Sequence, residues 1–302
     1  MRTPPAVTVR APAKINLHLG VGPGREDGFH ELATVYQAIG LYDDVSVTEA
    51  AEWSVALTAT GDLDTTGVPL DDTNIAIRAG HVLAEHHGIT RCARIQISKS
   101  IPVAGGLAGG SADAAATLVA LDRLWDLQTP DDDLLSLAGL LGSDVPFALL
   151  GGTAYGTGRG ELVEPVADRG QWWWVVVPNP EGISTAQAYA EYDALGLGEQ
   201  LRAPEVLFDA LQAATPEALA PELHNDLEPA ALALRPELAT TQQELLDAGA
   251  YAALLSGSGP TWLGLAADAD HAREIAGNLQ DSFPVVLCAP GPVAGAHVVT
   301  YA

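Results

Sequence analysis

A glycine-rich segment at residues 102–111, Pro-Val-Ala-Gly-Gly-Leu-Ala-Gly-Gly-Ser, limits the fold of this chain more than any other feature. It follows residues 94–99, where apolar and polar side chains alternate as in a half-buried strand. It precedes residues 111–125, which are rich in alanine and carry apolar residues at helical spacing. A glycine turn between a strand and a helix lets backbone N–H groups converge on an anion at the positive end of the helix dipole. The sequence therefore predicts an anion site, with a purely structural loop as the alternative.

Two better-known phosphate loops do not fit this turn. The pattern G-x-x-x-x-G-K-[ST] is absent because neither lysine of the chain, Lys14 or Lys99, follows a glycine. The dinucleotide pattern G-x-G-x-x-G is absent because the glycines come in adjacent pairs, which disfavours a dinucleotide-dependent dehydrogenase. Lys99 flanks the entry to the turn, and we expect Ser111 to cap the helix or to reach a phosphate oxygen or its metal.

Charge and composition exclude several classes of partner. The formal net charge of the 302 residues is −25, so the backbone of a nucleic acid would be repelled. No apolar run approaches the roughly 20 residues of a membrane span, and the first residues lack the apolar core of a signal peptide, which predicts a cytoplasmic protein without a membrane partner. Cys92 and Cys288 are too few for a disulfide framework and lie in no zinc-binding pattern.

The remaining periodicity predicts an α+β protein. In the first half we expect two strand pieces in residues 7–20 broken at Pro12, a loop carrying the glycines of residues 20–28, strands at 33–39 and 44–48, and helices at 74–87 and 131–141. We expect Asp72 or Thr73 to cap the helix at 74–87. In the second half we expect strands at 172–178, 252–255, 261–265 and 285–287, and helices at 185–192, 204–213, 238–248 and 271–279.

Three motifs together point to a family. Residues 102–112 resemble the central ATP-binding motif of the GHMP kinase superfamily. Residues 11–19, Ala-Pro-Ala-Lys-Ile-Asn-Leu-His-Leu, resemble its N-terminal motif, and residues 255–260, Leu-Ser-Gly-Ser-Gly-Pro, resemble its C-terminal glycine motif. The resemblance implies the two-domain GHMP kinase fold. Its N-terminal, ribosomal-protein-S5-domain-2-like domain would cover residues 1–168, its C-terminal ferredoxin-like domain residues 169–302, and ligands would lie between them.

Three segments indicate which branch of the superfamily this is. Residues 13–17, 27–30 (Asp-Gly-Phe-His) and 142–147 (Gly-Ser-Asp-Val-Pro-Phe) resemble the branch that acts on a cytidine-diphosphate alcohol. The resemblance implies ATP-dependent phosphorylation of the 2-hydroxyl of a cytidine-diphosphate derivative of methylerythritol, in non-mevalonate isoprenoid biosynthesis. It implies ATP and Mg²⁺ as cofactors, metal ligands that stay unknown, only small-molecule partners, and a monomer or homodimer. A kinase for homoserine, a sugar or a mevalonate derivative, and a sensor that binds nucleotide without turnover, remain alternatives.

The resemblance also assigns two catalytic residues. Asp144 matches the family's aspartate and would accept the hydroxyl proton or orient that oxygen. Aspartate is also among the commonest helix caps, so a capping role is the alternative. Lys14 matches the lysine of the N-terminal motif and would stabilise negative charge on the reacting oxygens. A surface lysine is its alternative.

The binding residues follow from the same motifs. The expected ATP-binding residues are Lys99, Pro102, Val103, Ala104, Gly105, Gly106, Leu107, Ala108, Gly109, Gly110, Ser111 and Ala112. The expected acceptor-binding residues are Asn16, Phe29, His30, Thr185 and Tyr189. Phe29 and Tyr189 would stack on the base while His30 reads its polar edge, although packing remains the alternative for each. Phe29 stands where the family often has tyrosine, which keeps stacking but loses a hydroxyl contact.

Asp113 leaves a question open. It puts a carboxylate at the start of the helix that should receive a phosphate. It would oppose the phosphate unless it points away or helps to hold magnesium. The sequence does not decide between these arrangements.

Overall fold

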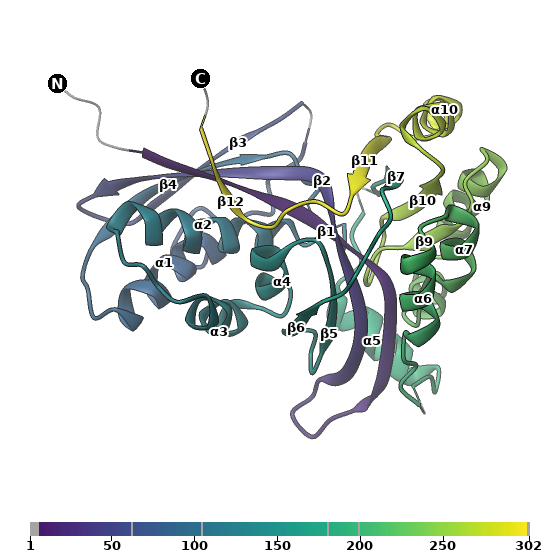
Figure 1. Cartoon of the computed structure of the whole chain (residues 1–302), viewed down its shortest axis with the longest axis horizontal. Helices are drawn as coiled ribbons and strands as arrows, with labels where there is room; N and C mark the ends of the chain where they lie inside the picture. Colours follow the sequence, from purple (N-terminus) through teal and green to yellow (C-terminus); the bar gives the residue numbers. More distant parts are fainter. Residues whose placement is uncertain (1–5, 62, 104, 180, 199, 301–302) are drawn as a thin grey trace.

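The protein is described here by a computed structural model, which covers residues 6–61, 63–103, 105–179, 181–198 and 200–300. Two sheets with their helices lie beside each other (Figure 1). The first sheet and its helices carry most of the first half of the chain, and the second sheet carries most of the second half. No helix in the described ranges is both long and apolar enough to cross a membrane.

An eight-stranded sheet organises the first half of the chain. Its strands are β1 (Ala6–Gly24), β2 (His30–Ala50), β3 (Ser54–Ala59), β4 (Cys92–Lys99), β5 (Thr153–Thr157), β6 (Leu162–Pro165), β8 (His224–Asn225) and β12 (His297–Val299). The long antiparallel pair β1 and β2 lies at its centre, and β12 returns from the C-terminal part of the chain to pair with β1. The helices beneath this sheet in Figure 1 are α1 (Ile75–His86), α2 (Gly109–Trp125), α3 (Asp131–Leu141) and α4 (Val145–Leu150).

Strand alternation decides which side chains of β4 enter the core. Ala93, Ile95 and Ile97 are fully buried on one face of the strand. Side chains two positions apart in a strand share a face, so Lys99 turns inward with them. The same alternation that builds the core therefore buries a lysine beside the glycine turn.

The second sheet has the ferredoxin-like arrangement predicted from the family resemblance. Its strands, β7 (Trp172–Val177), β9 (Ala253–Leu255), β10 (Trp262–Ala266) and β11 (Leu287–Gly291), lie in the order β11-β7-β10-β9 with every pair antiparallel. Its helices are α5 (Thr185–Ala194), α6 (Glu205–Ala213), α7 (Pro216–Leu219), the short 3₁₀ helix η1 (Ala220–Glu222), α8 (Glu228–Leu234), α9 (Leu238–Asp247) and α10 (Ala269–Leu279). Helices between the first and second strands and between the third and fourth complete the β-α-β-β-α-β pattern. The predicted α+β GHMP kinase fold is confirmed.

The two sheets share a hydrophobic core. One cluster of buried side chains includes Ile15 and Val35 of the first sheet together with Trp174 and Leu263 of the second. Within it, Trp174 Nε1 donates a hydrogen bond of 2.9 Å to Gln37 Oε1, which satisfies two buried polar groups. β12 also crosses back to the first sheet, so a part of residues 169–302 pairs with the N-terminal half. The domain boundary at residue 168 stays a prediction.

Several predicted boundaries were wrong, for local reasons. Pro12 does not break the first strand: β1 continues past it with a shift of pairing register between Pro12 and Ala13. The glycines as far as Gly24 belong to β1, because Gly20 and Gly24 pair with residues of β2, with a shift of register between Val21 and Gly24. Asn74, rather than Asp72 or Thr73, caps α1, since its side chain accepts a hydrogen bond from the Ala76 N–H.

The helix at 131–141 matches its prediction at both ends. The short strands β3, β5, β6, β8 and β12 were not predicted. β5, β6, β8 and β12 are two to five residues long, so pairing with neighbouring strands defines them. β3 does alternate, with Val55 and Leu57 less exposed than their neighbours, and could have been predicted from the sequence.

Candidate active site

A cleft of about 1070 Å³ runs from the glycine turn past β1 and β2 to α5. Most of the residues predicted for ATP and acceptor binding line it. They are Lys14, Asn16, Phe29, His30, Lys99, Pro102, Val103, Gly105, Gly106, Ala108, Gly109, Gly110, Asp144, Thr185 and Tyr189. Leu107, Ser111 and Ala112 are not among its lining residues, and Ala104 lies outside the described residues.

The glycine turn leads directly into the start of α2. The helix begins at Gly109, and Ala108 occupies the cap position in a left-handed conformation with φ 57°. Ser111 is therefore the third helical residue, and the prediction that it caps the helix was wrong. Among the residues that the structure describes, no side-chain hydrogen bond caps this end of α2, so its first backbone N–H groups are open to an anion.

The turn also contacts the C-terminal glycine motif. Ser256 Oγ donates a hydrogen bond of 3.1 Å to the carbonyl of Gly106. Gly106 has φ +75°, and a Cβ atom there would lie 2.1 Å from the Ser256 carbonyl oxygen. Only glycine fits this approach, so the turn and the motif share one wall of the cleft.

Lys14 and Asp144 face each other in the cleft, with 3.8 Å between Lys14 Nζ and Asp144 Oδ2. Lys14 Nζ donates to Asn16 Oδ1 at 2.8 Å, and Asn16 Nδ2 donates to Thr34 Oγ1 at 2.8 Å. Asn16 thus orients the lysine, which is buried rather than at the surface. Asp144 precedes α4, but its side chain makes no capping hydrogen bond. The carboxylate stays 31% exposed and available to a substrate.

Tyr36 lies beside Asp144. The sequence did not predict this role, because Tyr36 appeared there only as part of a strand. Its ring is buried and stacks on Phe147, with 4.9 Å between ring centroids. Burial, together with the charge of Asp144 and a side-chain hydrogen bond to it, raises the pKa of Tyr36 well above its usual value. The hydroxyl therefore keeps its proton and can serve as a donor to the carboxylate.

Lys99 lies between two buried carboxylates. Its Nζ donates to Asp43 Oδ2 and to Asp113 Oδ2, the latter at 2.8 Å. Asp43 Oδ1 also accepts a hydrogen bond of 3.0 Å from the Ile101 N–H, which ties the cluster to the entry of the glycine turn. The ammonium predicted to bind ATP is thus already paired, so its contact with the nucleotide stays a prediction. The alternation of buried and exposed residues in β4 could have predicted that the Lys99 side chain points inward.

The same cluster answers the question about Asp113. This residue is the fifth of α2, beyond the first turn, and its carboxylate points to Lys99. Burial raises the pKa of Asp113 to about 8, with the charge of Lys99 opposing the rise and that of Asp43 adding to it. The raised pKa favours the protonated form of Asp113, whose carboxyl group is bonded to Lys99 inside the buried cluster of Asp43, Lys99 and Asp113. The helix start therefore gains no carboxylate charge that would repel a phosphate.

Aromatic side chains line the other end of the cleft. Phe29 is 49% exposed, and the His30 ring stacks on Tyr189 with 5.0 Å between centroids. His30 Nε2 lies 2.9 Å from Asp193 Oδ1. An ionised carboxylate only accepts hydrogen bonds, so Nε2 carries the proton and Nδ1 is the nitrogen left for a ligand. Asp193 was missed, although it follows Tyr189 by four residues and thus shares its helix face.

Two more contacts border this end. Thr185 Oγ1 lies 3.2 Å from Ser258 Oγ, which joins the start of α5 to the C-terminal glycine motif. Arg159 lines the cleft, with its guanidinium 5.0 Å from the Phe29 ring centroid and its Nε 3.2 Å from Glu161 Oε1. Arg159 was also missed, because its glycine-rich surroundings indicated only a loop.

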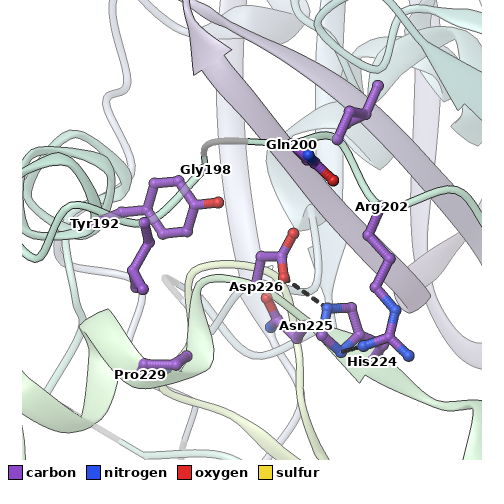
Figure 2. A pocket seen from close by; sticks show the side chains of 10 residues that line it. Tyr192, Gly198, Gln200, Arg202, His224, Asn225, Asp226 and Pro229 are labelled. Carbon is purple, nitrogen blue, oxygen red and sulfur yellow. Dashed lines mark hydrogen bonds and ion pairs between the residues drawn. The ribbon is translucent and has the colours of Figure 1, made fainter.

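A second cavity of about 430 Å³ lies near the end of α5 and beside β8 (Figure 2). Its charged side chains are already paired: Arg202 Nη1 donates to His224 Nδ1 at 3.1 Å, and His224 Nε2 lies 2.6 Å from Asp226 Oδ1. Asn225 donates to the carbonyls of Leu255 and Gly257 at 2.8 and 2.7 Å. These hydrogen bonds hold the backbone of the C-terminal glycine motif in place.

No cluster of three or more histidine, cysteine, aspartate or glutamate side chains suited to a metal ion occurs in the described ranges. Mg²⁺ usually keeps several waters and is held by one or two carboxylates together with substrate phosphates. The partly exposed carboxylate of Asp144 fits that requirement.

Family models match both halves of the chain. The model for the GHMP kinases N terminal domain matches residues 74–152, and that for the GHMP kinases C terminal region matches residues 207–285. These matches overturn the alternative of a dinucleotide-dependent dehydrogenase.

Curated relatives cover nearly the whole chain. A 4-diphosphocytidyl-2-C-methyl-D-erythritol kinase of Nocardioides sp. is 58% identical over 97% of this chain and all of the relative. The protein of the same name from Mycolicibacterium gilvum is 49% identical over 97% of this chain and 93% of its own length.

Solved structures agree with these relatives. A crystal structure of 4-(cytidine 5'-diphospho)-2C-methyl-D-erythritol kinase has a TM-score of 0.78 and 33% identity, covering 95% of this chain and all of the other. A mevalonate kinase from L. major has a TM-score of 0.72 and 16% identity, covering 98% of this chain and all of the other, and so shares the fold. Since both family models match in order and relatives of this identity span almost its whole length, the chain belongs to the GHMP kinase family.

Proposed function

We propose that this chain is an ATP-dependent kinase that phosphorylates the 2-hydroxyl of 4-diphosphocytidyl-2-C-methyl-D-erythritol, in the non-mevalonate pathway to isoprenoid precursors. One observation carries the proposal. The facing pair Lys14 and Asp144 lies in a cleft that has an uncapped helix N-terminus at one end and Phe29, His30 and Tyr189 at the other. The relatives named for this substrate support the same acceptor.

The arrangement supports in-line phosphoryl transfer. The acceptor oxygen bonds to the γ-phosphorus while the bond from that phosphorus to the β,γ-bridging oxygen breaks. Asp144 accepts the hydroxyl proton, and the hydroxyl of Tyr36 holds its carboxylate in place. Lys14 stabilises the negative charge on the reacting oxygens, with Asn16 fixing its position.

The glycine turn serves the nucleotide in this proposal. The open N–H groups at the start of α2 bind the ATP phosphates, and Gly106 lets the turn close against Ser256. A magnesium ion arriving with ATP would be held by the phosphates and water, and would supply neutralisation of phosphate charge.

At the acceptor end, the base would stack on the exposed ring of Phe29. His30 would present Nδ1, an acceptor, to the exocyclic amine of the cytosine.

A panel of acceptors tests the proposal. The purified chain is incubated with ATP and Mg²⁺ and with the cytidylyl methylerythritol, homoserine, mevalonate or galactose, and ADP release and ³¹P NMR report transfer. We expect a new phosphomonoester only with the cytidylyl acceptor, and none with its analogue lacking the 2-hydroxyl. Turnover of homoserine or mevalonate in place of the cytidylyl acceptor would refute the proposed substrate, and nucleotide binding without any turnover would favour a sensor.

A further inference from the structure

The cleft offers few positive charges to an anionic acceptor. The whole chain has a formal net charge of −25, so long-range attraction of an anion is unfavourable and cations must act locally. Among the described residues that line the cleft, those with a lysine or arginine side chain are Lys14, Lys99 and Arg159. An acceptor that carries a diphosphate therefore depends on those N–H groups of the three side chains that are not already bonded within the protein.

Two of the three cations are already engaged. The Lys99 side chain is 2% exposed and is bonded to Asp43 and Asp113. Lys14 is bonded to Asn16 and faces Asp144, where the phosphoryl group is transferred in the proposed reaction. Neither ammonium is therefore free for a diphosphate that lies away from the reacting hydroxyl.

Arg159 is held in a way that leaves one edge of its guanidinium open. Its Nε pairs with Glu161 Oε1 at 3.2 Å, and Glu161 Oε2 accepts a hydrogen bond of 2.6 Å from the Arg159 backbone N–H. The Arg159 Cζ lies over the Phe29 ring, and the side chain is 34% exposed. Within the part of the chain that the structure describes, no hydrogen bond occupies its two terminal nitrogens.

We propose that Arg159 binds the diphosphate of the acceptor through these terminal nitrogens. This inference rests on the proposed function. A planar guanidinium matches two phosphate oxygens at once, whereas a lysine supplies only a point charge. The diphosphate is joined to the base through a single ribose, so a guanidinium packed on the base-stacking Phe29 lies at the correct end of the cleft. Glu161 and Phe29 orient the guanidinium before the ligand arrives, which lowers the entropy lost on binding.

Binding of acceptor fragments to an Arg159→Gln variant tests this role. Calorimetric titration gives the Kd of cytidine, CMP and CDP for the wild type, for Arg159→Gln and for Arg94→Gln, a control with the same charge change on an exposed position of β4. We expect Arg159→Gln to weaken CDP by roughly ten- to a hundredfold and to leave cytidine unchanged, because only the phosphates meet the guanidinium. Arg159→Lys should recover part of the CDP affinity, and Arg94→Gln should match the wild type.

Each other result counts against the role of Arg159. Equal weakening of cytidine and CDP would mean that Arg159 only supports the Phe29 ring, and unchanged CDP affinity would mean that it is a solvated surface cation. In both cases wild-type turnover of the cytidylyl acceptor would leave the proposed function intact. A wild type that binds none of the three ligands and phosphorylates no cytidylyl acceptor would overturn both proposals.

Discussion

At the residue scale, the cleft depends on two carboxyl groups. Asp144 and Asp113 are both beside a lysine, yet their surroundings differ. Asp144 is 31% exposed and has the Tyr36 hydroxyl as a donor, whereas Asp113 is buried with a second carboxylate, Asp43, on the same lysine. Asp144 is thereby open to a substrate hydroxyl, whereas burial raises the pKa of Asp113.

Replacing Asp144 with asparagine tests the first of these roles. The amide keeps the shape of the side chain but cannot accept the hydroxyl proton, so we expect kcat to fall by about 10²- to 10⁴-fold with little change in the KM for ATP. Steady-state ADP release measures both constants. Asp132→Asn, the same change at an exposed position in α3, should leave kcat unchanged. Near-normal kcat in Asp144→Asn would remove its role as a base.

Asp113 should make the stability of the protein depend on pH. Its pKa is about 8 in the folded chain and 3.8 as a free side chain, so between these values the folded state holds a proton that the unfolded state has lost. The free energy of unfolding should therefore decrease as pH rises from about 4 to 8, with this one group contributing at most about 1.4 kcal/mol per pH unit. Urea unfolding at several pH values measures the slope. Asp113→Asn, which has no proton to lose, should flatten it, and equal slopes in the two proteins would contradict the raised pKa.

At the element scale, the glycine turn and α2 form the structural basis of the proposed nucleotide site. The element types on either side of the turn followed from alternation in β4 and from helical spacing in α2. The residue at which α2 starts could not be predicted in this way, because it depends on the left-handed Ala108 and on the contact of Gly106 with Ser256. Local sequence thus determined which elements meet at the turn, and packing determined how closely they approach.

Replacing Gly106 with alanine should disrupt this approach. A Cβ atom would lie 2.1 Å from the Ser256 carbonyl oxygen, and alanine is strained at φ +75°. We expect a loss of roughly 1–3 kcal/mol in the free energy of unfolding, together with a higher KM for ATP. Gly139→Ala in α3 is the control, because no atom lies within 4 Å of its added Cβ, and it should stabilise the protein by about 0.5–1 kcal/mol. Wild-type stability in Gly106→Ala would show that the turn can shift away from the Ser256 carbonyl without cost.

At the scale of the whole molecule, the two sheets share one core. The C-terminal strand β12 returns to the first sheet (Figure 1). The cleft is bordered by both halves of the chain, because Lys14 and Asp144 belong to the first half and Thr185 and Tyr189 to the second. Cytoplasmic location, and the choice between a monomer and a homodimer, stay predictions from the sequence.

The shared core predicts a single unfolding transition. Trp172 and Trp174 of the second sheet pack in the same cluster as Ile15 and Val35 of the first, so losing one sheet exposes the core of the other. We expect far-UV circular dichroism and tryptophan fluorescence to give the same midpoint in urea. Two separated midpoints would indicate domains that unfold independently, as a boundary at residue 168 by itself would suggest.

The sequence by itself determined the kind of fold and the position of the glycine turn between β4 and α2. Alternation and helical spacing are local patterns, and the three glycine and lysine motifs are short continuous segments. The fold of the second sheet, the helix at 131–141 and the family were therefore predicted correctly. The roles of Lys14 and Asp144 came from the same motifs and await the kinetic test.

Only the tertiary structure decided which charged groups are paired and which are available. Asp43 and Asp113 are 70 positions apart in the chain, yet both bind Lys99, and Asp193 reaches His30 across 163 positions. The free edge of Arg159 likewise depends on Glu161 beside it and on Phe29 far away in sequence. A residue's charge can be read from the sequence, but its pKa and its free hydrogen-bonding groups depend on neighbours that only folding brings together.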